Sequence, residues 1–184
     1  MPEPLIVIDL QRGFDDPVWG RRDNPDCERN VGRLVAAWHE RGEPVVVVRH
    51  DSGPADAGSP LTPGQPGNDL RPEAALDEAA LLVTKQVNSA FYGEPDLHGW
   101  LQAQGAERIV VCGLTTNHCC ETTVRMAGNL GYDVRFVLDA TATFDRVGPD
   151  GELVTAEEIA RASAASLHDE FCQVVSTEAV LGQS

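Results

Sequence analysis

The sequence predicts an α/β fold, a three-layer α/β/α sandwich with a parallel sheet of about six strands. Short apolar runs rich in Val, Ile and Leu recur without alternation, which is typical of strands buried on both faces of a parallel sheet. Segments with apolar residues at helical spacing lie between these runs, and right-handed crossovers then place helices on both faces of the sheet. A length of 184 residues favours a single domain over residues 1–184.

The expected strands and helices alternate along the chain. Apolar runs predict strands at 5–9, 45–48, 81–85, 109–112, 132–138 and 171–175. Amphipathic patterns predict helices at about 27–41 and 95–104, a third helix that begins after residue 116 or 117 and runs to about 130, and a fourth at about 155–167. Gly113 is expected to end the fourth strand, and Thr116 or Asn117 can then cap the third helix, since their side-chain oxygens accept free amide protons of a first turn. Thr155 and Glu158 form a capping-box pattern before the last helix.

The longest irregular stretch covers about 52–71. It contains Gly53-Pro54, Ser59-Pro60 and Pro63-Gly64-Gln65-Pro66-Gly67, and this density of proline and glycine excludes a regular helix or strand. A loop of this length inside a compact domain usually serves a function or moves. We interpret it as one wall of the functional site and not as a linker between domains.

Composition and charge exclude several classes of protein. Fourteen Lys and Arg residues against 29 Asp and Glu give a net charge of −15, which would repel a nucleic-acid backbone. The longest apolar runs are too short to cross a membrane, and the first residues lack the pattern of a secretory signal. The five cysteines show no CxxC spacing, so neither a disulfide framework nor a zinc knuckle is expected. We expect a cytoplasmic protein that binds neither nucleic acid nor membrane.

Reactive side chains follow the predicted strands. Asp9, His50, Lys85, Cys119 and Asp139 each lie at the end of an apolar run or in the turn beyond it. The carboxyl ends of parallel strands meet at one edge of the sheet, where open α/β folds bind their ligands. An acid, a base and a thiol are therefore predicted to meet at that edge. For Asp139, a capping role in the core is the simpler interpretation.

Helical spacing separates the two adjacent cysteines. Cys120, Val124 and Ala127 recur at steps of four and three, as a stripe of small apolar residues that packs against a sheet. Cys119 lies about 100° away on the helix and in its first turn, where free amides and the helix dipole lower the pKa of a thiol. Cys119 is therefore the candidate nucleophile. The alternative is that both cysteines are small buried hydrophobic residues.

Three motifs resemble those of the isochorismatase-like cysteine hydrolases. They are Val7-Ile8-Asp9-Leu10-Gln11, Thr84-Lys85 with Ser89-Ala90-Phe91, and Gly113-Leu114-Thr115-Thr116-Asn117-His118-Cys119 with Thr122-Thr123. Each motif stands at a strand end and the three occur in the family's order, so the resemblance covers nearly the whole chain. It implies a Rossmann-like sheet of the isochorismatase type, with Asp9, Lys85 and Cys119 as catalytic residues.

The resemblance also implies how these residues act. Asp9 accepts the thiol proton, while Lys85 holds both groups electrostatically and lowers the pKa of Cys119. A cis, non-proline peptide bond is implied between Leu114 and Thr115, and the amides of Thr115 and Cys119 would form an oxyanion hole. The implied reaction is hydrolysis of a C–N bond of amide, lactam or carbamoyl type in a small molecule, through a thioester intermediate.

Two departures from family patterns narrow the activity. Nicotinamidases of this family hold a metal with a strand-end Asp, a His two residues later and a further His, whereas this chain has Asp51-Ser52-Gly53. We therefore expect no metal and no cofactor. Isochorismatases cleave a vinyl ether and need no thiol, so Cys119 favours an amidase. The alternatives are isochorismatase or nicotinamidase activity, a non-catalytic small-molecule-binding or interaction subunit, and a redox protein, although vicinal cysteines on a helix make a strained pair.

Residues near the predicted site are candidates for substrate binding. They are Gln11, Phe14, Trp19, His50, Phe91 and His118. Phe14 and Trp19 follow the first strand and would form an aromatic wall, although ordinary packing explains them equally well. The two histidines are as readily explained by structural roles. The family resemblance implies a homodimer or homotetramer with a small-molecule substrate.

Overall fold

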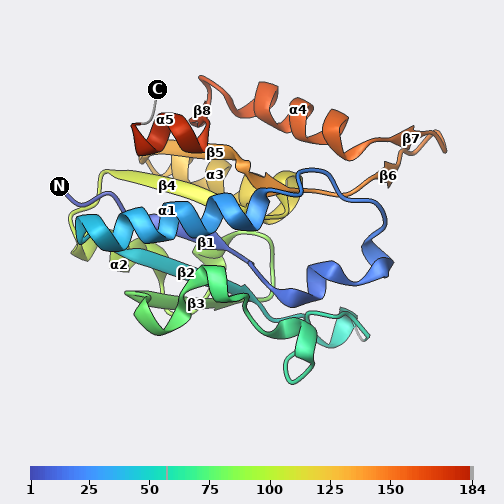
Figure 1. Cartoon of the computed structure of the whole chain (residues 1–184), viewed down its shortest axis with the longest axis horizontal. Coiled ribbons are helices and arrows are strands. Elements are labelled where there is room, and N and C mark those ends of the chain that lie inside the picture. The colour runs from blue at the N-terminus through green and yellow to red at the C-terminus, as the bar shows by residue number, and fades with distance from the viewer. Residues whose placement is uncertain (57, 183–184) are drawn as a thin grey trace.

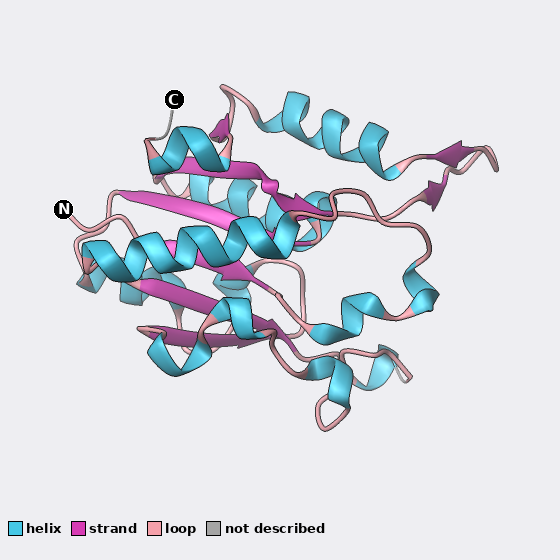
Figure 2. Cartoon of the chain, viewed as in Figure 1, coloured by secondary structure: helices cyan, strands magenta, loops and turns pink. Residues whose placement is uncertain are grey.

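A computed structural model describes residues 1–56 and 58–182, and Figure 1 shows how the elements are layered. Six strands form one sheet in the order β3-β2-β1-β4-β5-β8. All neighbouring strands in this sheet pair in parallel. Figure 2 shows helices on both sides of the sheet. The predicted three-layer α/β/α class is therefore confirmed.

Each strand of the sheet overlaps a predicted apolar run, but β5 continues to Ala142, so Asp139, which was expected after the strand, lies inside it. The strands are β1 (Leu5–Ile8), β2 (Val45–His50), β3 (Leu81–Lys85), β4 (Arg108–Leu114), β5 (Asp133–Ala142) and β8 (Gln173–Val175). Two more strands, β6 (Arg146–Val147) and β7 (Leu153–Val154), pair antiparallel outside the sheet. In Figure 2 this hairpin projects from the body of the molecule. Strands of two residues are too short to give a periodic signal, so the sequence does not predict the hairpin.

Within residues 1–56 and 58–182, five α-helices cover the sheet. They are α1 (Cys27–Arg41), α2 (Leu97–Ala103), α3 (Glu121–Asn129), α4 (Ala156–Leu167) and α5 (Thr177–Leu181). Alternate residues of β1 face the two layers, because Leu5 packs in the cluster that contains residues of α1 and α5, whereas Ile6 packs in the cluster that contains residues of α2 and α3. Helix α5 is absent from the sequence predictions, since five residues carry little amphipathic pattern.

The start of α4 forms as predicted. The side chain of Thr155 accepts a hydrogen bond from the amide of Glu158, and the Glu158 carboxylate accepts one from the amide of Thr155. Two free amide protons of the first turn are satisfied in this way. The capping box fixes the point at which the chain returns from the projecting hairpin into a helix.

Strand β4 does not end at Gly113 as expected. Gly113 pairs with Ile8 of β1, and the strand continues to Leu114. The backbone of β1 comes so close that a Cβ on residue 113 would lie 2.0 Å from the Ile8 carbonyl oxygen, and the φ angle of Gly113 is +118°. Only glycine tolerates this combination. It allows the chain that carries the candidate nucleophile to emerge directly beside Asp9.

Neither expected cap of the third helix is present. A π-helical turn over Thr116–Cys120 precedes α3, and its N-cap residue, Thr115, makes no capping hydrogen bond with its side chain. The Thr116 hydroxyl donates to Thr141 Oγ1, and Asn117 Oδ1 accepts a hydrogen bond from Thr143. The side chains of Thr116 and Asn117 therefore bond residues at the end of β5 and just beyond it, and not the free amides of the helix. These bonds hold the nucleophile turn against β5.

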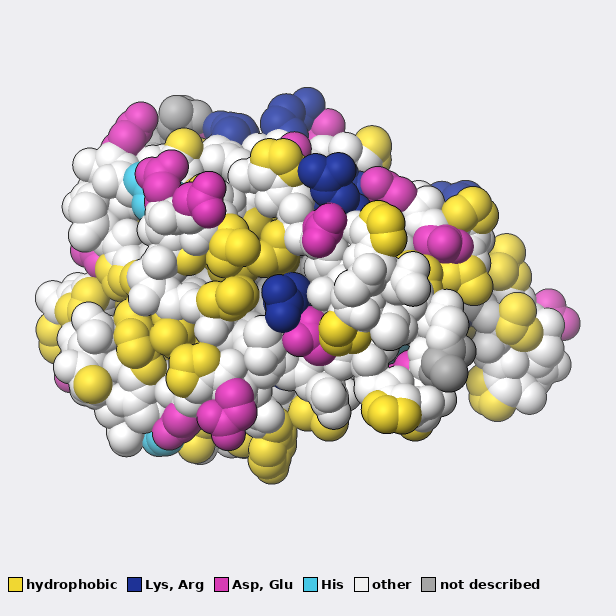
Figure 3. Space-filling view, turned by 90° about the horizontal axis from the view of Figure 1, so that it is seen from below, with side chains coloured by type: hydrophobic (Ala, Val, Ile, Leu, Met, Phe, Trp, Pro, Cys, Tyr) yellow, Lys and Arg dark blue, Asp and Glu magenta, His cyan; other side chains and the backbone are white. Residues whose placement is uncertain are grey.

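The surface reflects the acidic composition. Figure 3 shows one face of the molecule, on which acidic side chains are scattered among groups of hydrophobic ones. In the part of the chain that the structure describes, none of the helices combines the length and apolar character that crossing a membrane requires.

Candidate active site

A buried ion pair joins β1 to β3. Lys85, the last residue of β3, donates a hydrogen bond of 2.6 Å from Nζ to Oδ2 of Asp9, which follows β1. Both side chains are fully buried. Burial lowers the pKa of Lys85, but attraction by Asp9 and Cys119 outweighs it, so the net pKa is raised. Lys85 is therefore protonated, and a positive charge is held inside the protein beside the candidate thiol.

One carboxylate oxygen of Asp9 is left without a partner. Oδ1 is buried and accepts no hydrogen bond from any residue within 1–56 or 58–182. Buried polar atoms are normally satisfied, and those that are not often belong to a functional site. A carboxylate oxygen, a ring nitrogen of His50 and Sγ of Cys119 all lie within 4.8 Å of one another. Asp9 thus offers an acceptor beside the thiol.

Cys119 lies in the π-helical turn, and its side chain reaches a small cavity. Burial raises the pKa of its thiol and the Asp9 carboxylate raises it further, while Lys85 acts in the opposite direction. The expectation of a net lowered pKa for Cys119 is therefore wrong. Only 7% of the residue is exposed, and the desolvation this causes could not be read from local helix geometry. Sγ of Cys119 also contacts Oδ1 of Asn88 at 3.8 Å.

His50 completes the polar cluster. Its Nδ1 lies 3.2 Å from Nζ of Lys85. Because an ammonium group only donates, Nδ1 acts as the acceptor and the ring proton resides on Nε2. Burial lowers the pKa of His50, and the charge of Lys85 lowers it further. The imidazole is therefore neutral at neutral pH.

The carboxylate, imidazole and thiol are also donor types that bind metals. Lys85 Nζ lies among them, 2.6 Å from Asp9 and 3.2 Å from His50. A cation at this place would meet an ammonium charge at short range. The donor set is therefore better explained as an ion-pair cluster than as a metal site.

The turn before Cys119 has the geometry that the family resemblance implied. The peptide bond between Leu114 and Thr115 is cis, and neither residue is proline. The carbonyl oxygen of Thr115 accepts hydrogen bonds from the amides of His118 and Cys120. Thr115 itself lines the cavity, whereas Leu114 is fully buried in the core.

The cavity at Cys119 is small, with a volume of about 110 Å³. The predicted site residues in its lining are Asp9, Phe14, Trp19, His50, Thr115, His118 and Cys119. Three further lining residues, Leu61, Asn88 and Arg146, are not among the predictions. Leu61 belongs to the irregular stretch at 52–71, which therefore does form part of the wall. Arg146 lies on the hairpin and has no sequence signal of its own.

An aromatic group forms one side of the cavity. The rings of Phe14 and Trp19 lie 5.3 Å apart between centroids, and Phe144 packs against both. The indole nitrogen of Trp19 donates to the carbonyl oxygen of Gly13. These contacts fix the orientation of the rings, so Phe14 and Trp19 are both packed and exposed to the cavity.

Two predicted substrate contacts lie away from the cavity. The carboxamide of Gln11 donates to the carbonyl oxygens of His50 and Asn68 and accepts from the amide of His50. Gln11 therefore holds the loop after β2 in place. Phe91 packs in the core and stacks on Tyr132, with 6.1 Å between centroids. Neither residue is placed to touch a ligand beside Cys119.

A larger cavity lies next to this one. Its volume is about 710 Å³, and its lining includes Lys85, Asn88 and the acidic residues Asp51 and Glu94. Asn88 belongs to both linings. The side chain of Asn88 therefore stands between the small cavity at Cys119 and the wider space.

Asp139 has a structural role. Its Oδ1 accepts hydrogen bonds from both the amide and the hydroxyl of Thr177, at 2.7 and 2.9 Å, at the start of α5. Its carbonyl oxygen accepts from the side chains of Asn24 and Asn30. Asp139 also lines a separate cavity of about 620 Å³ whose lining includes residues of α4 and β8. The interpretation as a cap fits these contacts.

Comparisons with known proteins agree with this geometry. The sequence model described as "Isochorismatase domain" matches residues 3–179. The uncharacterized isochorismatase family protein YrdC of Bacillus subtilis is 35% identical over 177 residues, which cover 96% of this chain and 93% of YrdC. Nicotinamidase 3 of Arabidopsis thaliana is 44% identical over 155 residues, covering 77% and 73% of the two chains.

A solved structure shows the same fold. The crystal structure of a putative hydrolase of the isochorismatase family from Chromobacterium violaceum superposes with a TM-score of 0.92 at 38% identity. The match covers 99% of this chain and 93% of the other.

Proposed function

This chain belongs to the isochorismatase family and is an isochorismatase-like cysteine hydrolase, and from that premise we propose that it cleaves a C–N bond of amide, lactam or carbamoyl type in a small molecule. The observation that carries the proposal is the buried Asp9–Lys85 pair beside Cys119, with Oδ1 of Asp9 unpartnered among the described residues. Burying two charges is costly, and chemistry that uses them is a reason to retain the pair.

In the proposed first step Asp9 takes the proton of Cys119 as the thiolate forms its bond to the carbonyl carbon. The amides of Thr115 and Cys119 stabilise the negative oxygen of the tetrahedral intermediate. As that intermediate collapses, the C–N bond breaks and Asp9 gives its proton to the departing amine. A thioester on Cys119 remains.

In the second step water cleaves the thioester. Asp9 accepts a proton from water as the new C–O bond forms, and the proton returns to sulfur when the C–S bond breaks. Lys85 remains protonated throughout, and its charge offsets the negative charge that is shared between Asp9 and the sulfur. Each turnover therefore restores the thiol and the carboxylate.

The raised thiol pKa supports this order of events. A free thiolate would react without a base, whereas a thiol needs one at the moment of attack. Asp9 is the carboxylate in the cavity lining and lies in the same cluster as the sulfur. Deprotonation is therefore proposed to accompany attack on the substrate.

The assembly and location of the protein form part of the proposal. A homodimer or homotetramer would cover the apolar side chains of Val147 and Leu153 on the projecting hairpin, which are 70% and 60% exposed. We propose that the partner is a small-molecule substrate in the cytoplasm, with neither nucleic acid nor membrane involved. The net charge of −15 supports the exclusion of nucleic acid.

Nicotinamidase activity is the second candidate, because the relative from Arabidopsis thaliana carries that name. The aromatic pair Phe14 and Trp19 in the lining is chemically compatible with a ring-bearing amide. A non-catalytic binding subunit would have no need of a buried ion pair beside a thiol.

An ammonia-release screen tests the proposal. Small aliphatic amides, carbamoyl compounds and nicotinamide are incubated with the protein, with and without a chelator. Lactams are followed by mass spectrometry of the ring-opened amino acid, because their nitrogen is not released as ammonia. We expect release from at least one class, unaffected by the chelator and abolished after the protein is alkylated with iodoacetamide. Release that survives complete alkylation of Cys119 would contradict the assignment of the nucleophile.

A further inference from the structure

The chain that follows β3 forms a loop that closes on itself beside the active site. At the base of this loop the amide of Thr84 donates to the carbonyl oxygen of Glu94, and the amide of Glu94 donates to the carbonyl oxygen of Thr84, each at 2.8 Å. Lys85 leaves this base, and its side chain is held by the ion pair with Asp9. Both ends of the loop are therefore fixed in position.

The middle of the loop is attached to α3. The amide of Ala90 donates to Oγ1 of Thr123 at 3.0 Å, and Oγ of Ser89 donates to the sulfur of Met126 at 3.2 Å. Ala90, Thr123 and Ser89 are buried, whereas Asn88, directly before these anchors, is exposed. The backbone at Asn88 is therefore held, and its side chain is the part that can change position.

The side chain of Asn88 separates two cavities and is weakly held. It lines both the cavity of about 110 Å³ at Cys119, the small cavity, and the neighbouring cavity of about 710 Å³, the wide cavity. Among the described residues its carboxamide makes one hydrogen bond, the 3.8 Å contact between Oδ1 and Sγ of Cys119. A thiol is a weak donor, so little opposes rotation of this side chain. Rotation away from the sulfur would connect the two cavities.

The sizes of the two cavities indicate how a substrate would be divided between them. Typical ligand pockets have volumes of roughly 300–1,000 Å³; the small cavity lies below this range and the wide cavity lies within it. Asp9 lines the small cavity and not the wide one, so the nitrogen that would receive its proton stays in the small cavity. The acyl side of the substrate is therefore the part that can extend past Asn88.

The lining of the wide cavity suits a substituent without negative charge. Val87 and Tyr92, which are 50% and 72% exposed, provide apolar surface. Lys85 and Asp51 also line this cavity, but each forms an ion pair. Glu94 forms no ion pair in the described part of the chain, so it supplies the remaining charge, which would repel a carboxylate.

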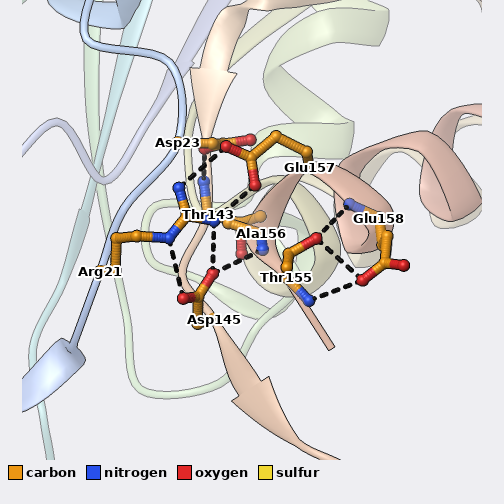
Figure 4. Close-up of polar contacts among 8 residues, drawn as sticks. All are labelled: Arg21, Asp23, Thr143, Asp145, Thr155, Ala156, Glu157 and Glu158. Carbon is orange, nitrogen blue, oxygen red and sulfur yellow. Dashed lines mark hydrogen bonds and ion pairs between the residues drawn. The ribbon is translucent and has the colours of Figure 1, made fainter. Parts of the chain in front are cut away.

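A second polar cluster, at the start of α4, is satisfied within the fold. Figure 4 shows Arg21 between the carboxylates of Asp145 and Glu157. Nε of Arg21 donates to Asp145 and NH1 donates to Glu157, each at 2.9 Å. Oδ1 of Asp145 also accepts from the amide of Ala156 at 2.8 Å. A ligand would have to break these ion pairs, whereas a single weak contact has to be broken at Asn88.

We propose that the natural substrate is an amide or carbamoyl compound with an extended acyl side, whose reacting carbonyl enters the small cavity while an uncharged substituent passes Asn88 into the wide cavity. Asn88 is then a specificity-determining residue, because its side chain has to rotate away from the sulfur before the substituent fits. The substituent supplies binding energy at a distance from the reacting bond. This inference rests on the proposed function and names its substrate class.

The test compares iodoacetamide with N-benzyl iodoacetamide, two uncharged reagents that differ in one substituent. With either reagent the sulfur of Cys119 forms a bond to the methylene carbon, the C–I bond breaks, iodide leaves, and the thiol proton passes to the buffer. Rates are measured at one pH by tandem mass spectrometry, with Cys119→Ala as the blank for the other cysteines. The ratio of the benzyl rate to the iodoacetamide rate cancels any change in the thiolate fraction, and N-acetylcysteine gives this ratio without a cavity.

In the wild type we expect a ratio at least roughly tenfold above that of N-acetylcysteine, since burial of the benzyl ring favours the larger reagent. Thr122→Phe should remove most of this preference, because residue 122 lines the wide cavity and not the small one, and a ring there takes the space of the substituent. Gln86→Trp, at an exposed position of the same lining, is a second blocking variant with the same expected effect.

Asn88→Ala should raise the ratio roughly threefold, since no hydrogen-bonded side chain then has to be displaced. Asn129→Ala is the matched control, because it removes an exposed asparagine on α3 that lies outside both linings. It should leave the ratio as it is in the wild type. Thermal melting establishes that each variant is folded.

A wild-type ratio no higher than that of N-acetylcysteine would overturn the proposal. The same holds if the folded blocking variants lower the ratio by less than about twofold, since a filled subsite must cost more than that. An unchanged ratio in Asn88→Ala would overturn the role of Asn88. The labelling requires no turnover, so failure of the ammonia screen would contradict the proposed function, while the ratio would still decide whether the wide cavity binds the substituent.

Discussion

Asp9 and Asp139 both belong to the central sheet region, yet their surroundings differ. Oδ1 of Asp139 accepts hydrogen bonds from the amide and the hydroxyl of Thr177, which anchors α5 to β5. Asp9 pairs with Lys85 through Oδ2 and leaves Oδ1 buried without a partner among the described residues. The Asp139 carboxylate therefore uses Oδ1 in a structural contact, whereas the Asp9 carboxylate has a free acceptor oxygen beside the thiol of Cys119.

This difference teaches how to separate a reactive acid from a structural one. A predicted position after a strand does not suffice, because the sequence predicts that position for both aspartates, whereas the structure places Asp139 inside β5. The deciding property is whether hydrogen bonds within the fold use the carboxylate fully. Removing the reactive group should change catalysis far more than folding, and removing the structural contact should do the reverse.

The largest expected effect comes from Cys119→Ala. Turnover should fall roughly 10³-fold or more, because no thioester forms. Thermal unfolding should change little. Cys120→Ala is the matched control, since Cys120 is fully buried and outside the lining of the cavity. Equal turnover by the two alanine variants would contradict the assignment of Cys119 as the nucleophile and Cys120 as a core residue.

Lys85→Met addresses the other half of the ion pair. Turnover should fall roughly 10²-fold or more, because the charge that balances Asp9 and the sulfur is lost. The pKa of His50, followed by NMR, should rise, since two effects lower it, burial first and the charge of Lys85 second, and the variant removes the second. An unchanged pKa of His50 in a folded variant would show that Lys85 does not act on the imidazole.

The lowered pKa of His50 predicts how the free energy of unfolding changes with pH. Its folded pKa lies below the unfolded value of about 6.5, so the unfolded state binds more protons between the two values. The contribution to the free energy of unfolding is complete above about pH 6.5 and is lost as the pH falls through the folded pKa. Urea unfolding across this range, with Lys85→Met for comparison, measures it.

The smallest expected effect lies on the structural side. Thr177→Val removes the hydroxyl bond to Asp139 and leaves the amide bond. Because residue 177 is fully buried, we expect the free energy of unfolding to fall by about 1 kcal/mol, measured by chemical denaturation. Turnover should stay within about twofold of wild type, since no reacting group moves. A large loss of turnover would tie the Asp139 region to catalysis.

Much of this arrangement is predictable from the sequence. Buried apolar runs fix the sheet, and the residues after them bring Asp9, Lys85 and the Cys119 turn to one edge. Spacing also separates Cys119 from the core residue Cys120, which is fully buried. These features depend on local patterns that each segment carries by itself.

Other features depend on tertiary contacts and are not predictable in this way. The sequence predicts that Gln11 contacts the substrate, but its carboxamide is fully engaged in hydrogen bonds with backbone groups of His50 and Asn68. The raised pKa of Cys119 follows from burial by distant elements. Arg146 reaches the cavity on a hairpin whose strands have two residues each, too few to form a periodic pattern in the sequence.

The most direct test compares Asp9→Asn with Asp139→Asn, since both exchanges are nearly isosteric and remove one negative charge. Turnover and thermal stability are measured for each folded protein. We predict that Asp9→Asn loses roughly 10²- to 10⁴-fold in turnover, the usual contribution of a general base, while Asp139→Asn stays within about twofold of wild type. Full turnover by Asp9→Asn, or equal losses in both variants, would contradict the account.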